Sequence, residues 1–180
     1  MNKIAMELPF KEIDNYPKHI DAHTVLCRML EGLGYRLHWA TQGLSEKDLS
    51  YKPSPEAMNT WETIEHIAYL IHILDATFHE KCLERGVGPK FKSLEDFRHY
   101  ALTTIQELCN LLRGQELHDL EHLKLKYQAG SSTLEYPFWH LINGPISDAI
   151  YHIGQIVSFR RTCGNPINEK VNVFMGKNRP

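Results

Sequence analysis

The chain has 180 residues, long enough for one domain with a sizeable core, and its 42% hydrophobic and 23% charged content is ordinary for a globular protein. The formal net charge of −2 argues against a nucleic-acid groove or an anionic membrane surface as partner. No apolar run approaches the ~20 residues of a membrane span, and the N-terminus lacks the longer apolar region of a signal peptide. The four cysteines are far apart and form no Cys-x-x-Cys pair, which fits a reducing compartment. We therefore expect a cytoplasmic protein that binds neither nucleic acid nor membrane.

The first half of the chain predicts an N-terminal arm followed by two long helices. The arm ends near residue 16, and the first helix covers about 19–42. Its apolar stripe recurs at the helical period and consists of Leu26, Leu30, Leu33 and Leu37. Two prolines make a loop of residues 51–56. The second helix is predicted over about 60–85, with Thr60 as its N-cap and the glycine-rich segment that follows as its end.

The second half predicts two further helices and one ambiguous segment. The third helix covers about 93–113 and has an apolar stripe at the same period. Residues 115–136 suit either helix or extended chain, and their role stays open. The fourth helix covers about 138–162, and a Gly-Pro pair at 144–145 predicts a kink or a restart within it.

These four predicted helices determine the expected fold. No long alternating run indicates a strand. Four amphipathic helices joined by loops predict an all-α four-helix bundle, forming a single domain over residues 1–180 with an N-terminal arm and a C-terminal tail. The tail contains one apolar patch, residues 171–175, that would pack on the bundle or on a partner.

Asp148 and His152 are the most informative pair for function. They lie four residues apart in a predicted helix, so their side chains share one face. A carboxylate and an imidazole at this spacing can hold a divalent ion if another helix supplies a third ligand, and His66 is the best candidate. The alternative is an Asp–His hydrogen bond between helical neighbours, which needs no metal and no third residue.

Three segments resemble the DinB/YfiT-like superfamily of four-helix-bundle proteins. Residues 44–55 (LSEKDLSYKPSP) are similar to the family's segment before its second helix. Residues 61–68 (WETIEHIA) are similar to its tryptophan-led helix with a histidine. Residues 152–155 (HIGQ) are similar to its His-Arg-Gly-Gln signature. The resemblance covers most of the chain, from about residue 19 to 166.

The resemblance implies one divalent metal held by three positions, which are His66, Asp148 and His152 in this chain. Family members typically have histidine at position 148 and arginine at 153, whereas this chain has Asp148 and Ile153. Aspartate is a competent ligand for Zn, Ni, Mn or Fe, so the site is expected to be altered but functional. The implied function is a metal-dependent hydrolase or thiol-dependent transferase with a small-molecule substrate, a thiol being one candidate. The alternative is a non-catalytic binding or stress-response bundle with a degenerate metal site.

Other histidines offer weaker candidates. Two pairs share the four-residue spacing, His19 with His23 and His118 with His122, but polar surroundings favour solvated surface positions. His140 lies on the same predicted helix as His152 and would line the same cavity or pack in the core. Bundles with short loops and an apolar tail often pair, so a homodimer is expected.

Overall fold

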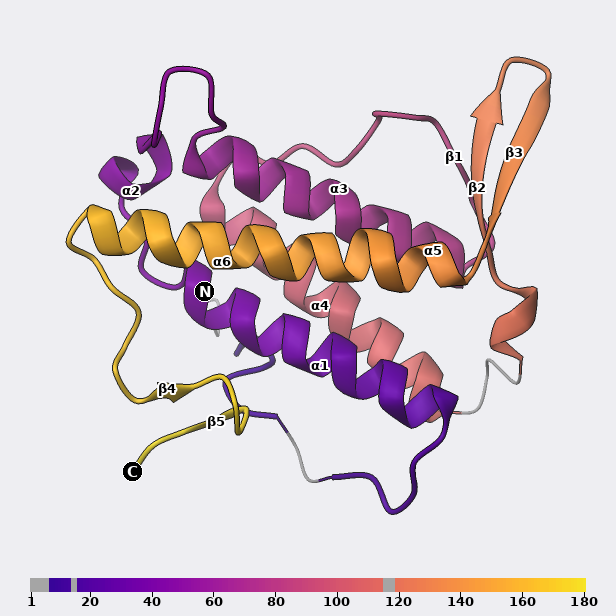
Figure 1. Ribbon diagram of the computed structural model, residues 1–180, viewed down its shortest axis with the longest axis horizontal. Coiled ribbons are helices and arrows are strands. Elements are labelled where there is room, and N and C mark those ends of the chain that lie inside the picture. The colour runs from indigo at the N-terminus through magenta and orange to yellow at the C-terminus, as the bar shows by residue number, and fades with distance from the viewer. Residues whose placement is uncertain (1–6, 14–15, 115–118) are drawn as a thin grey trace, which may run out of the picture.

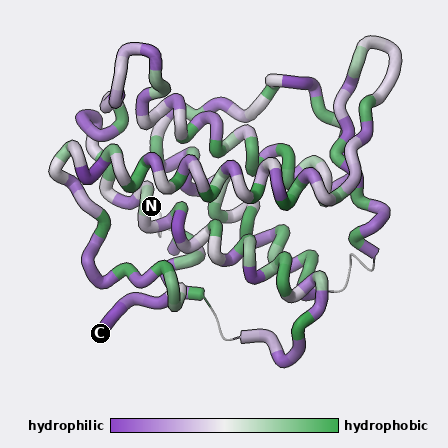
Figure 2. The backbone as a smooth tube through the Cα atoms, in the orientation of Figure 1, coloured by the Kyte–Doolittle hydropathy of each residue, from purple (hydrophilic) through white to green (hydrophobic). Residues whose placement is uncertain are grey.

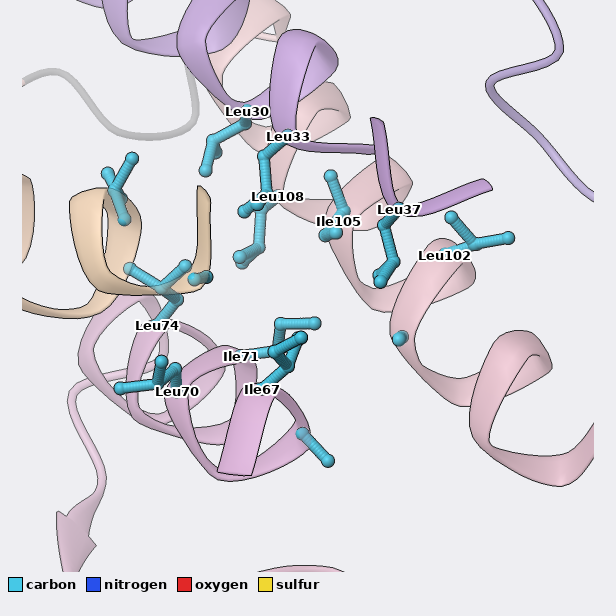
Figure 3. Close-up of a cluster of buried hydrophobic side chains, with 14 of the residues drawn as sticks. Leu30, Leu33, Leu37, Ile67, Leu70, Ile71, Leu74, Leu102, Ile105 and Leu108 are labelled. Atoms are coloured by element: carbon cyan, nitrogen blue, oxygen red, sulfur yellow. The ribbon is translucent and has the colours of Figure 1, made fainter. Parts of the chain in front are cut away.

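The computed structural model describes residues 7–13, 16–114 and 119–180. Four long helices pack side by side: α1 (Ala22–Thr41), α3 (Thr60–Phe78), α4 (Leu94–Arg113) and α6 (Ser147–Thr162) (Figure 1). A short helix, α2 (Glu46–Ser50), precedes α3. The predicted stripes form the core. Figure 3 shows leucines and isoleucines from α1, α3 and α4 facing one another, among them Leu33, Ile71 and Leu108, all fully buried.

The helices are amphipathic along their whole length. Figure 2 shows hydrophobic and hydrophilic residues alternating along each of the long helices, as a helix with one buried face requires. Among the helices in the described part of the chain, none combines the length and the apolar character needed to cross a bilayer.

The expectation of an all-α four-helix bundle is wrong, because the structure also contains two small sheets. The first has the order β1 (Cys82–Leu83), β2 (Lys124–Ala129) and β3 (Ser132–Pro137), with β1 parallel and β3 antiparallel to β2. The hairpin of β2 and β3 stands at one end of the helices (Figure 1). The second sheet pairs β4 (Val171–Asn172) with β5 (Lys177–Asn178).

The ambiguous segment supplies most of the first sheet. Leu125 and Tyr127 are buried and their neighbours Lys124 and Gln128 are exposed, which is the two-residue alternation of a half-buried strand. The alternation spans only six residues and was too short to stand out in the sequence. The pairing of β1 with β2 joins segments about 40 residues apart, so no local pattern indicates it.

The second long helix ends seven residues earlier than predicted. Its last residues form a Schellman motif, in which Lys81 N–H donates to Ala76 O at 2.7 Å and Glu80 N–H to Thr77 O at 3.1 Å. Glu80 takes the left-handed conformation (φ 52°) that glycine usually supplies at this position. Residue 80 is glutamate and not glycine, so the usual stop signal of a helix is missing from the sequence at this point. The N-cap is Asn59, one residue before the predicted Thr60.

The fourth predicted helix is three segments in a continuous rod: α5 (Trp139–Leu141), the π-helix η2 (Ile142–Ile146) and α6. The helix changes from α to π geometry around the Gly-Pro pair at 144–145, where a kink or a restart was predicted. Pro145 has no N–H to donate to the helical ladder, and a widened π turn accommodates such a residue. The remaining short helix is η1 (Leu120–His122), just before β2.

Both ends of the described chain pack near the C-terminal half of α1. Phe10 and Ile13 are buried, and Ile13 N–H donates to Gly176 O at 2.7 Å, so the arm and the tail meet. Tyr35 Oη donates to Asn178 Oδ1 at 3.0 Å. The C-terminal tail therefore packs on this chain's own helices.

His38 fixes the arm to α1 and makes stability depend on pH. Its Nδ1–H donates to Pro9 O at 2.8 Å, while its buried Nε2 has no hydrogen-bond partner among the described residues. Burial lowers the pKa of His38, and the nearby Arg98 and Lys11 charges lower it further. The unfolded chain therefore takes up this proton at a higher pH than the folded protein.

The contribution of His38 to stability is thus fully present above its unfolded pKa of about 6.5 and is lost as the pH falls from there toward the folded pKa. The variant His38→Asn keeps a donor for Pro9 O but does not titrate. Between pH 7.5 and 5.5 we expect its unfolding free energy to fall less than that of wild type. The difference between the two proteins is at most about 1.4 kcal/mol per pH unit. Urea denaturation at the two pH values measures this. Equal losses in both proteins would contradict it.

Candidate metal centre

The structure brings the three predicted ligands together between two neighbouring helices. His66 lies midway along α3, and Asp148 and His152 lie one turn apart on α6. His66 Nε2 is 3.2 Å from Asp148 Oδ2, and His152 Nε2 is 3.4 Å from Asp148 Oδ1. One ligand atom from each residue lies within 4.8 Å of the others. The three side chains therefore converge on one point and could hold a metal ion there.

The cluster is closed on one side and open on the other. The His152 side chain is 11% exposed, whereas His66 and Asp148 are 35% and 41% exposed. The two imidazole rings lie edge to face with centroids 4.6 Å apart. His152 thus forms the floor of the site, and an ion bound there would keep access to solvent.

Gln155 fixes the orientation of His152. The Gln155 Oε1 atom can only accept a hydrogen bond, and it lies 2.8 Å from His152 Nδ1. With the Gln155 amide in this orientation, a neutral ring carries its proton on Nδ1 and has its Nε2 lone pair directed toward the Asp148 carboxylate. A metal ion between these two electron-rich atoms, or a second proton on the imidazole, would satisfy both of them. Histidine metal ligands almost always donate their other ring N–H to an oxygen acceptor, and the Gln155 amide oxygen would be that acceptor here.

A simple Asp–His hydrogen bond accounts for this arrangement less well. Such a bond would use one imidazole and one carboxylate oxygen, and the 3.4 Å separation of His152 from Asp148 is long for it. Here both carboxylate oxygens face an imidazole, each from a different helix. The donor set of two imidazoles and one carboxylate fits a divalent transition metal.

Asp148 also lines a cavity of about 340 Å³ beside the cluster. His140 is exposed and not packed in the core. It lines this cavity together with Asp148 but without His152, and its ring packs against Tyr136 with centroids 5.5 Å apart. The cavity lies between α3, the hairpin of β2 and β3, and the π-helical segment, so the elements that the sequence did not indicate form much of its wall.

Among the described residues, the pair His19 and His23 is not part of a metal-binding cluster, and the second pair includes a residue that the structure does not describe. His19 is exposed and forms an ion pair with Asp21 at 2.9 Å. His122 is also exposed and pairs with Asp119 at 3.0 Å. His118 lies outside the described residues.

Sequence reasoning missed two groups near the site. Gln155 belongs to the HIGQ motif, but its hydrogen bond to His152 became visible only when the helix placed both side chains. Arg85 lines the cavity but fell at the end of a predicted helix. Tyr69 accepts a hydrogen bond from Gly86 N–H at 3.1 Å and so anchors the loop that carries Arg85.

Comparison of the chain with protein-family models found no match, and comparison with curated proteins found none either. The interpretation of the site therefore rests on its residues and geometry.

Proposed function

We propose that this protein is a metal-dependent enzyme whose single divalent ion is held by His66, Asp148 and His152. The observation that carries the proposal is the convergence of two imidazole Nε2 atoms on the two oxygens of one carboxylate. The fixed tautomer of His152 supports it, because Nε2 is thereby ready to bind a cation without losing a proton.

Zn, Ni, Mn and Fe are the metals that this donor set suits. Three protein ligands leave at least one position open, which is the pattern of catalytic sites, whereas structural zinc sites are closed by four ligands. Such an ion supplies Lewis acidity and lowers the pKa of water or a thiol bound to it. The adjoining cavity gives a small substrate a place beside Asp148.

Two reaction classes remain within this proposal, hydrolysis and thiol-dependent group transfer. The likeness of residues 44–55, 61–68 and 152–155 to the DinB/YfiT-like superfamily supports both. In either reaction, the residues of the chain would hold the substrate in the cavity. The open side of the cluster, where Asp148 and His66 are partly exposed, would admit the water or the thiol.

Metal analysis tests the proposal directly. Protein purified without nickel resin is expected to contain, or to take up on addition of Zn, Ni, Mn or Fe, about one ion per chain by mass spectrometry. A folded chain that takes up none of these metals would contradict the proposal and favour the non-catalytic alternative. A spectral change of cobalt-loaded protein on adding a thiol would support transfer, whereas ester hydrolysis without such a change would support hydrolysis.

A further inference from the structure

The cavity beside the metal cluster has walls of two kinds. Ten residues line its volume of about 340 Å³, which is within the range of small-molecule sites. Apolar and aromatic side chains form most of the wall, from Leu70, Ile73, Leu125, Tyr127, Tyr136 and Pro145. Two of the lining residues carry a full charge at neutral pH, Arg85 and Asp148.

Arg85 is placed at this cavity by the small sheet. Leu83 pairs with Tyr127 in the parallel β1–β2 register and is itself buried. Two residues further on, the Arg85 guanidinium lies over the Tyr127 ring at 5.8 Å from its centroid. The bond from Gly86 N–H to Tyr69 Oη holds the following turn. Arg85 is an exposed residue whose guanidinium contacts the Tyr127 ring, while the bond to Tyr69 holds the backbone beside it.

Arg85 has no acidic partner of its own. Within the described part of the chain, no carboxylate lies within ion-pair distance of its guanidinium, although the chain contains 22 acidic residues. Its planar fork of N–H donors matches the geometry of a carboxylate. The Asp148 oxygens, by contrast, face the two imidazoles.

The aromatic part of the wall suits a flat or apolar body. The Tyr127 and Tyr136 rings lie edge to face with centroids 6.4 Å apart, and His140 continues the row beyond Tyr136. Burial and a hydrogen bond to Tyr69 raise the pKa of Tyr127, so its ring stays uncharged beside a ligand at neutral pH.

We propose that this cavity binds a small organic carboxylate, whose anionic group pairs with Arg85 and whose apolar body lies against Tyr127 and Tyr136. The inference rests on the proposed function, because it takes this molecule to be the substrate and places its reacting group near Asp148. In the metal-free protein the negative charge of Asp148 repels a carboxylate and leaves Arg85 as its partner, whereas a bound divalent ion would cancel this repulsion.

The test compares phenylacetate with its uncharged counterpart phenylacetamide, by calorimetric titration of zinc-loaded and metal-free protein. Wild type is expected to bind phenylacetate about three- to fivefold more tightly, as one partly exposed ion pair allows. Arg85→Gln should lose this preference, and Arg85→Lys should keep part of it. Arg161→Gln, which removes an exposed arginine outside the cavity, should behave as wild type. Metal content and circular dichroism should not change in any variant.

Three outcomes would overturn the inference: equal binding of the two probes, no binding of either at millimolar concentration, or a preference that Arg85→Gln retains. A preference retained in that variant but lost in metal-free protein would show that the probe carboxylate binds the ion instead of Arg85. Failure of the proposed function gives a different result. If the chain binds no metal but prefers phenylacetate in an Arg85-dependent way, the anion site is supported and the metal-dependent enzyme is contradicted.

Discussion

Replacing Asp148 with alanine is expected to lower the metal affinity of the protein by more than about 100-fold, which exceeds the usual cost of changing an outer-shell group. Asp148 is the residue that both histidines face, through Oδ2 toward His66 and Oδ1 toward His152. Without it, two imidazoles remain and no negative charge offsets the ion. Metal per chain, measured by mass spectrometry after equilibration with zinc, reports the loss.

Asp148→His is the matched control for this experiment. Histidine supplies a neutral ligand at the position where the resembled family has one, so this variant should retain about one metal per chain. Both variants should remain folded, because the Asp148 side chain is 41% exposed and the apolar core supplies most of the burial energy. A folded Asp148→Ala protein with full metal content would exclude Asp148 as a ligand.

Replacing Arg160 with methionine is expected to cost about 3 kcal/mol of unfolding free energy, because it removes a buried hydrogen-bond network. Arg160 is 4% exposed, and its Nη1 donates to three carbonyls at the end of α1, those of Trp39, Ala40 and Gln42, at 3.0 to 3.1 Å. Its Nε donates to Asn165 O at 2.6 Å. Methionine fills similar space but removes these hydrogen bonds, and the buried Ala40 carbonyl loses its partner.

The melting temperature should fall by roughly 6–12 °C for a chain of this length. Arg161→Met is the control, because Arg161 is the exposed neighbour in the same basic doublet. Its replacement should change stability by no more than about 0.5 kcal/mol. Equal losses in the two variants, measured by thermal denaturation with circular dichroism, would show that the network at Arg160 does not stabilise the fold.

The long helices and the Asp148–His152 pair could be predicted because their signals are local. The bounds of α1 and α4 are within three residues of the predicted ones, since each helix has a continuous apolar stripe and a capped start. The four-residue spacing of Asp148 and His152 is a property of one helix. His66 was a candidate third ligand from another helix, which the resemblance supported, and the packing of α3 against α6 brings it to the other two residues. The homodimer remains a prediction.

The sheets and the cavity could not be predicted, because contacts between distant segments create them. Leu83 becomes a strand residue only when it pairs with Tyr127, and this pairing also brings Arg85 to the cavity. The early end of α3, at Phe78, depends on the left-handed conformation of Glu80, which the tertiary structure imposes. No sequence pattern distinguishes the two adjacent arginines. Packing buries Arg160 against the carbonyls of α1, whereas Arg161 stays exposed.

The sequence by itself thus determined the four long amphipathic helices and the residue types of the metal site, since hydrophobic period and ligand spacing act within one turn or one helix. The tertiary structure decided how these parts meet. It brought the imidazoles of His66 and His152 close to the Asp148 carboxylate and placed Gln155 beside His152. It also formed a cavity against a hairpin that no helical pattern indicates. The physical reason is that packing and strand pairing depend on residues far apart in the chain, whose relative positions are fixed only when the whole core forms.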